Sequence, residues 1–353
     1  MAPVTLSTLL LTSLAAVASA RNCKNLTIPL SLSVQNADFT LKAPSNDIEV
    51  TNYVLHSGRA GVYYADEILS EEKAALFKFS LDGAAFDRTY WDFPAHAYNY
   101  SYANAALARN YSVFFFDRPG IGQSSRGDPV NEIQSNLEVA ALYALTTKLR
   151  RGAVPGVDSR HDKIVHVGHS YGSAQTYALA AAAHSDEPVS DALALTGFTL
   201  GLGTYVNNFL FGANFVLADR EAYGPGYITA GDVSAVQSNF FAPDNFDPEI
   251  LEEAYKTGAP TAVGELLTIG ALTATNNSYS GPVFVITGEN DIAFCGGNCY
   301  VTNPSIPAQV ASSFPNNTLI ESYVVAGSGH GLNLEYSAQD TYARILDFFD
   351  KSV

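Results

Sequence analysis

The chain has 353 residues and a formal net charge of −16 at pH 7, from 35 acidic and 19 basic side chains. A protein this acidic is repelled by nucleic acid and by anionic membrane surfaces, so neither is expected as a partner. The length is typical of an α/β enzyme that forms one domain with an insertion.

Residues 1–20 have the features of a secretory signal peptide. The stretch from Leu6 to Val17 is apolar, and Ala18-Ser19-Ala20 fits the small-x-small cleavage rule, although no Lys or Arg precedes the apolar stretch. That stretch is too short for a comfortable membrane span, and no later one is apolar for long enough. We therefore expect a secreted or vacuolar protein, glycosylated at the asparagines of its five Asn-x-Ser/Thr sequons: Asn25, Asn99, Asn110, Asn276 and Asn316.

Apolar runs alternate with helical patterns along the rest of the chain. Strands are expected at residues 38–42, 48–56, 76–81, 112–117, 164–167, 192–199, 282–287 and 319–325. Helices are expected at residues 103–109, 131–151, from 172 onward, and at 336–349. Strands that alternate with helices predict an α/β fold with a mostly parallel sheet and right-handed crossovers.

The interval 201–267 breaks this alternation, because it is rich in aromatic residues mixed with Gly and Asn. Most of these aromatic side chains should form the core of a second packed subdomain. A segment inserted between two strands at the carboxyl edge of the sheet would also cover that edge and line an apolar pocket. We therefore divide the chain into a signal peptide (1–20), a core (21–200 and 268–353) and a cap (201–267), and expect the pocket to favour medium-length acyl chains over acetate.

A G-x-S-x-G pentapeptide, Gly168-His-Ser-Tyr-Gly172, lies between a β-branched run and an alanine-rich helix. The pentapeptide also occurs by chance, so its place between a strand and a helix carries the interpretation. A sharp strand-to-helix turn would hold the hydroxyl of Ser170 at the carboxyl end of the sheet, and the two glycines avoid clashes there. Ser170 is therefore the candidate nucleophile.

A serine hydroxyl needs a base to take its proton, and the base needs an acid to orient it. His330 lies in a glycine-rich loop directly after the last predicted strand, whereas His166 and His169 flank the pentapeptide and are expected to be packed. Asp291 follows the preceding strand, which gives the chain order Ser, Asp, His. Glu289 is the rival acid in the same turn.

The chain has three cysteines. Cys295 and Cys299 could close a small disulfide loop, because the two glycines between them permit a tight turn. Cys23 would then be the odd thiol, although it could instead bond either of the others. One C-x3-C pair with no nearby histidine supplies only two metal ligands, so no metal site is expected.

These motifs resemble those of the α/β-hydrolase superfamily over nearly the whole chain after the leader. They are Gly168-His-Ser-Tyr-Gly172, Gly288-Glu-Asn-Asp291, Gly329-His330-Gly331 and Asp117-Arg-Pro-Gly-Ile-Gly-Gln-Ser124, and with its leader and sequons the chain is similar to secreted fungal members. The resemblance implies a mainly parallel eight-stranded sheet with helices on both faces, and no cofactor. It also implies an oxyanion hole made by the backbone N–H groups of Tyr171 and Ala84, although Asp82-Gly83 stands where relatives usually carry His-Gly.

The expected function is a serine hydrolase that cleaves a small apolar carboxylic ester or lactone through an acyl-enzyme. Two alternatives remain open. The same nucleophile could serve acyl transfer or rearrangement in secondary metabolism, with water excluded by the cap. The chain could also be a non-catalytic binding protein with this fold. Epoxide hydrolysis is disfavoured, since relatives with that activity carry Asp at the position of Ser170.

Overall fold

The computed structural model describes residues 23–39, 41–57, 68–77, 85–157, 160–182, 189–219, 221–317 and 319–353. The predicted signal peptide lies outside the described residues. The same holds for the larger part of the predicted strand 76–81 and for the segment Asp82-Gly83-Ala84.

The centre of the fold is a parallel sheet with the strand order β3-β4-β8-β9. Its strands are β3 (Val165–His169), β4 (Ala192–Thr196), β8 (Val283–Gly288) and β9 (Ile320–Val325). Every residue of β4 and β8 is buried, as expected for parallel strands covered on both faces. The described residues therefore contain four strands of the predicted eight-stranded sheet, each within a few residues of its predicted position.

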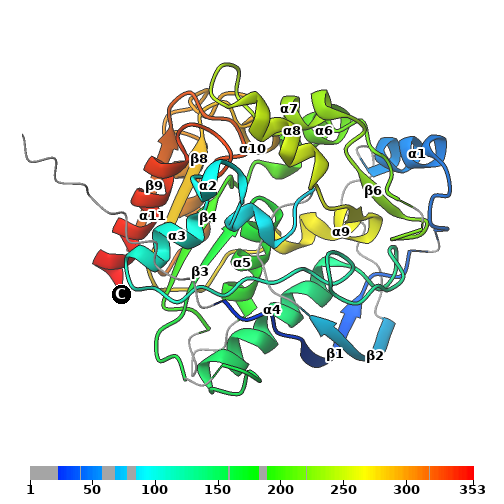
Figure 1. The fold of residues 1–353 in the computed structure, drawn as a ribbon, viewed down its shortest axis with the longest axis horizontal. Coiled ribbons are helices and arrows are strands. Elements are labelled where there is room, and N and C mark those ends of the chain that lie inside the picture. Colours follow the sequence, from blue (N-terminus) through cyan, green and yellow to red (C-terminus); the bar gives the residue numbers. More distant parts are fainter. Residues whose placement is uncertain are drawn as a thin grey trace, which may run out of the picture.

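Helices cover both faces of this sheet (Figure 1). On one side α5 (Tyr171–Ala182) packs against β3 and β4, and α4 (Ser135–Arg150) packs against α5. On the other side α11 (Ala338–Ser352) contacts β4, β8 and α3 (Tyr102–Ala108). All four helices lie where the sequence predicts them. The apolar side chains between the layers form a large central core, with smaller separate clusters around α4.

The predicted strand 48–56 is wrong, because this stretch forms the helix α1 (Asp47–Ser57). The side chain of Asn46 accepts a hydrogen bond from the N–H of Glu49 (3.0 Å), and the Glu49 carboxylate accepts one from the N–H of Ser45 (2.7 Å). These contacts cap the start of a helix. Val50 and Val54, four residues apart, are buried in the core on one helix face.

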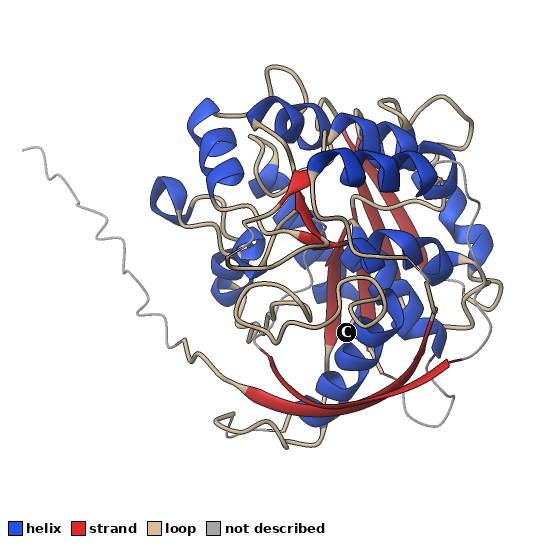
Figure 2. Cartoon of the chain, turned by 90° about the vertical axis from the view of Figure 1, so that its right-hand side faces the viewer, coloured by secondary structure: helices blue, strands red, loops and turns tan. Residues whose placement is uncertain are grey.

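Two more predicted strands differ from the structure. The described residues of 38–42 form no strand, and 112–117 contains only a single β-bridge residue, Phe116. An antiparallel pair lies instead at β1 (Ile28–Asn36) and β2 (Ile68–Phe77), apart from the parallel sheet (Figure 2). Apolar residues alternate along β1, which is the period of a strand with one covered face.

Residues 201–267, here called the inserted segment, connect β4 to β8 and have their own helices and a small antiparallel sheet, β5-β6-β7. The elements are α6 (Leu202–Gly212), β5 (Val216–Leu217), β6 (Tyr227–Thr229), α7 (Val233–Phe240), α8 (Pro248–Lys256), β7 (Thr261–Ala262) and α9 (Val263–Thr268). Short helices lie elsewhere at η1 (Arg88–Trp91), α2 (Ala95–Tyr98), η2 (Ile269–Thr273), α10 (Ile292–Cys295) and η3 (Pro307–Ser313).

A buried carboxylate, Glu335, fastens the inserted segment to the loop that carries His330. It accepts hydrogen bonds from the backbone N–H of Gly329 (2.9 and 3.0 Å), the N–H of Ala242 (2.6 Å) and the side-chain amide of Asn245 (3.2 Å). Burial raises the pKa of Glu335 to about 7, although these hydrogen bonds favour the ionised form.

We predict that Glu335 makes the stability of the fold depend on pH. Its pKa lies above the usual value of 4.5, so its contribution is fully present below pH 4.5 and is lost as the pH rises to about 7. Between these pH values the free energy of unfolding of the wild type should fall by about 3 kcal/mol more than that of Glu335→Gln. Urea unfolding at a series of pH values measures this difference, and parallel curves for the two proteins would contradict the prediction.

Cys295 and Cys299 are joined by a disulfide at the end of α10, with their Cα atoms 4.9 Å apart, while Cys23 is exposed and free. The N–H of Cys299 donates to the carbonyl oxygen of Glu289 (2.9 Å), and the N–H of Gly297 donates to that of Asp291 (2.8 Å). The disulfide therefore closes the turn that begins at Asp291.

Replacing both Cys295 and Cys299 by Ala should lower the free energy of unfolding by about 2 kcal/mol, because so short a loop restricts the unfolded chain only modestly. Thermal or urea unfolding gives the value. Cys23→Ala is the matched control and should leave stability unchanged. Peptide mapping without reduction that finds Cys23 bonded to either partner would refute this pairing.

Candidate active site

The turn between β3 and α5 holds Ser170 in a strained backbone conformation. Its φ is +55°, in the left-handed region that serine rarely adopts. The N–H of Ser170 donates to the carbonyl oxygen of Thr196 on β4 (2.9 Å), which fixes the turn against the sheet. A Cβ on Gly168 would overlap the carbonyl of Gly172, so the glycine is needed for the strand and helix to approach this closely.

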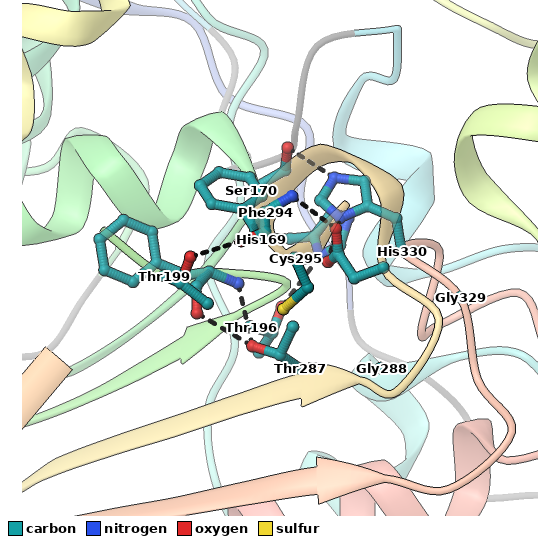
Figure 3. A network of polar contacts seen from close by, with 12 residues as sticks. His169, Ser170, Thr196, Thr199, Thr287, Gly288, Phe294, Cys295, Gly329 and His330 are labelled. Carbon is teal, nitrogen blue, oxygen red and sulfur yellow. Dashed lines mark hydrogen bonds and ion pairs between the residues drawn. The ribbon is translucent and has the colours of Figure 1, made fainter. Parts of the chain in front are cut away.

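His330 lies between Ser170 and Asp291, at the carboxyl edge of the sheet. Its Nε2 is 2.8 Å from the hydroxyl oxygen of Ser170, and its Nδ1 is 2.7 Å from a carboxylate oxygen of Asp291. Figure 3 shows the imidazole turned toward Ser170 from the loop that follows β9. The side chains of all three residues are buried. The structure thus brings together the three residues that the sequence selects.

The two acids of the turn after β8 point in different directions. The second carboxylate oxygen of Asp291 accepts a hydrogen bond from the N–H of Phe294 (2.8 Å) at the start of α10, which holds the first toward His330. The carboxylate of Glu289 accepts the N–H of Gly327 (2.9 Å) instead. Of the two rivals, only Asp291 contacts the imidazole.

Aromatic rings surround the imidazole of His330. The ring centroids of His169, Phe240 and Phe294 lie 4.8, 5.5 and 5.6 Å from its own. His169 stacks on Tyr90 at 4.5 Å, and burial together with the neighbouring His330 lowers its pKa well below the usual value. His169 is therefore a neutral wall of the site, and the enclosure keeps bulk water away from His330.

His166 is packed in the core, as the sequence predicts. Its two ring nitrogens bond the hydroxyls of Thr146 (2.9 Å) and Ser190 (2.8 Å), and burial lowers its pKa to about 4. A neutral, fully bonded imidazole has no proton or lone pair to offer a substrate.

Of the two expected oxyanion-hole donors, only Tyr171 lies among the described residues. Tyr171 is the first residue of α5, so its backbone N–H has no acceptor within the helix and lies at the positive end of the helix dipole. The hydroxyl of Tyr171 bonds that of Ser135 (3.0 Å), which holds its side chain in place. The other expected donor, Ala84, and the unusual Asp82 lie outside the described residues.

A buried ion pair lies beneath Tyr171. The Nε of Arg118 donates to a carboxylate oxygen of Glu265 (3.0 Å), and its guanidinium lies 5.4 Å from the ring centroid of Tyr171. Burial and the neighbouring Glu265 raise the pKa of Glu138, which lies 3.7 Å from the same Nε, well above its usual value. Glu265 belongs to α9, so this pair also fixes the end of the inserted segment. Sequence reasoning missed both Glu265 and Glu335, since nothing local to either residue marks its distant partner.

A small cavity of about 30 Å³ opens at Ser170. Apart from Ser170 and Tyr171 its walls are apolar: Val206, Phe209, Leu210, Leu266, Ile269, Ala293 and Phe294. A larger cavity of about 650 Å³ lies beside the outer edge of β3, and none of its described lining residues belongs to the Ser170, His330 and Asp291 group. The cavity at Ser170 is therefore the one that concerns the chemistry.

All five sequon asparagines are exposed. Among the residues that the structure describes, no helix is long and apolar enough to cross a membrane. Across the same residues, no group of three His, Cys, Asp or Glu side chains could hold a metal ion.

The comparisons with known proteins agree with this architecture. A model of the alpha/beta hydrolase family matches residues 83–345. An esterase from Thermogutta terrifontis is similar in structure, with a TM-score of 0.53, 16% identity, and 80% of this chain and 96% of the other covered. A bromoperoxidase from Bacillus anthracis has a TM-score of 0.50 and 16% identity, with 78% and 95% covered.

Such low identities show the fold alone, and no match is found among curated protein sequences. The family model, by contrast, spans well over half of the chain and includes all three residues of the site. The chain therefore belongs to the α/β hydrolase family.

Proposed function

We propose that this protein is a serine hydrolase that cleaves small apolar carboxylic esters or lactones. The observation that carries the proposal is the continuous hydrogen-bonded series from Ser170 through His330 to Asp291. In this geometry the imidazole can take the proton of the serine hydroxyl, while the carboxylate stabilises the charged imidazole that forms.

The reaction follows from these contacts. The oxygen of Ser170 attacks the ester carbonyl as its proton moves to Nε2 of His330, and the backbone N–H of Tyr171 stabilises the oxyanion. His330 then gives the proton to the departing alcohol, which leaves an acyl group on Ser170. Water attacks this acyl-enzyme, again with His330 as the base, and releases the acid.

The apolar walls support the substrate class. The side chains around the cavity carry no charge, so a charged group bound there would lose its hydration without gaining a partner. Val206, Phe209, Leu210 and Leu266 come from the inserted segment. We propose on this ground that residues 201–267 are the cap, and that they exclude water and supply the apolar surface.

Acyl transfer uses the same acyl-enzyme with an alcohol or amine in place of water. The aromatic rings around His330 favour this second candidate, because they limit the access of water to the base. Product analysis with and without an added alcohol separates the two, since only transfer gives a new ester in proportion to the acceptor.

The leader and the exposed sequons support secretion with glycosylation as a further part of the proposal. Expression in a host with a secretory pathway should yield a protein in the medium that begins near residue 21. An endoglycosidase should reduce its mass, and an unchanged mass would remove the glycosylation part.

Ser170→Ala and His330→Ala should each lower kcat for an activated ester by a factor on the order of several thousand, because Ser170, His330 and Asp291 act as a unit. Asp291→Ala should cost somewhat less. Glu289→Ala is the matched control on the same turn and should stay near the wild type. Loss of activity in Glu289→Ala with retention in Asp291→Ala would show that the acid is misassigned.

A fluorophosphonate probe tests whether the serine is activated at all. It should label Ser170 in the wild type, and it should label His330→Ala more slowly. An unlabelled wild type with normal thermal unfolding would favour the non-catalytic binding protein.

A further inference from the structure

We propose that the site accepts only short acyl groups, of two or three carbons, because the cavity beside Ser170 has room for no more. The inference deepens the proposed function and rests on it. It also replaces the expectation, drawn from the many aromatic residues of the inserted segment, that medium-length acyl chains are preferred.

The size of the cavity carries the argument. Pockets that bind drug-sized ligands measure roughly 300–1,000 Å³, whereas the cavity at Ser170 measures about 30 Å³. A single water needs about 10–15 Å³ on this scale, so two or three non-hydrogen atoms fill the space. The two or three carbons of an acetyl or propionyl group fit these limits when the carbonyl oxygen points out of the cavity toward the N–H of Tyr171, and the six carbons of a hexanoyl group exceed them.

The walls of the cavity indicate whether the cavity holds the acyl group or the alcohol of the ester. Ser170 and Tyr171 line it, and His330 does not. During the reaction the acyl group stays on the oxygen of Ser170, while the alcohol must take a proton from Nε2 of His330 to leave. The group beside Ser170 and away from His330 is therefore the acyl group, and the alcohol lies on the other side of the carbonyl.

The walls are also held in place. The ring of Phe209 packs edge-on against that of Phe240, with the ring centroids 5.8 Å apart. The side-chain amide of Asn239 donates a hydrogen bond to the backbone carbonyl oxygen of Phe209 (3.1 Å). Phe240 and Phe294 both pack on the ring of His330. A longer acyl chain that pushed these walls apart would displace the imidazole of His330. Burial of each added methylene would contribute only about 0.8 kcal/mol to binding.

The experiment compares kcat/KM for p-nitrophenyl acetate, propionate, butyrate, hexanoate and octanoate. We expect the highest value at acetate or propionate and a fall of at least tenfold by hexanoate. Leu210→Ala, which removes one wall of the cavity, should raise the ratio of hexanoate to acetate kcat/KM at least tenfold.

Two further variants supply a matched control and a second change to the cavity wall. Phe211→Ala changes the next residue on the same helix, whose side chain is 56% exposed and does not line the cavity, so its chain-length profile should match the wild type. Val206→Ala opens a half-buried wall and serves if Leu210→Ala fails to fold. Titration with the fluorophosphonate probe gives the active fraction of each variant. The measured rates are divided by this fraction before they are compared.

The possible outcomes separate the inference from the proposed function. A kcat/KM that is flat or rises from acetate to hexanoate overturns the short-acyl limit and leaves the hydrolase intact. An unchanged profile in both folded wall variants overturns it as well. No turnover of any ester, acetate included, by a wild type that the probe does not label removes the proposed function itself.

Discussion

The site depends on the hydrogen bonds of one imidazole, and these depend on how closely two loops approach each other. The turn after β8 carries Asp291, and the loop after β9 carries His330. A Cβ on Gly288 would overlap the carbonyl of Gly329, so the glycine at the end of β8 lets the two loops meet. The parallel register of β8 and β9 places both loops at the same edge as Ser170, so the sheet itself selects which side chains can meet.

The inserted segment and the core share the groups that hold the site. Glu335 binds the N–H groups of both Gly329 and Ala242, and Arg118 of the core pairs with Glu265. Each link is buried, so removal of one partner would leave a polar group without its bond in an apolar environment. These bonds therefore join the inserted segment to the loop of His330 and to the residues beside Tyr171 at the start of α5.

The sequence predicts the parts of this molecule that depend on local patterns. β4 and β8 are short apolar runs because both faces are buried, and Ser170 lies in a G-x-S-x-G motif whose place between a strand and a helix predicts the tight turn. The strand predicted at 48–56 is wrong because a capping pattern at Asn46 and Glu49 begins a helix there. Glu335 could not be found, since it bonds a residue 93 positions away and no local signal marks that contact.

Composition predicts the chemical character of a pocket but does not predict its size. Aromatic and aliphatic residues in the inserted segment predict apolar walls, and the walls at Ser170 are apolar. Composition also predicts that most aromatic residues of the segment form a core, and Phe215, Tyr227, Phe240 and Phe241 are indeed buried and do not line the cavity. The volume of the cavity depends on how α5, α6, α9, η2 and α10 pack around Ser170. A chain can therefore be rich in apolar side chains and still have a cavity of only about 30 Å³ beside Ser170.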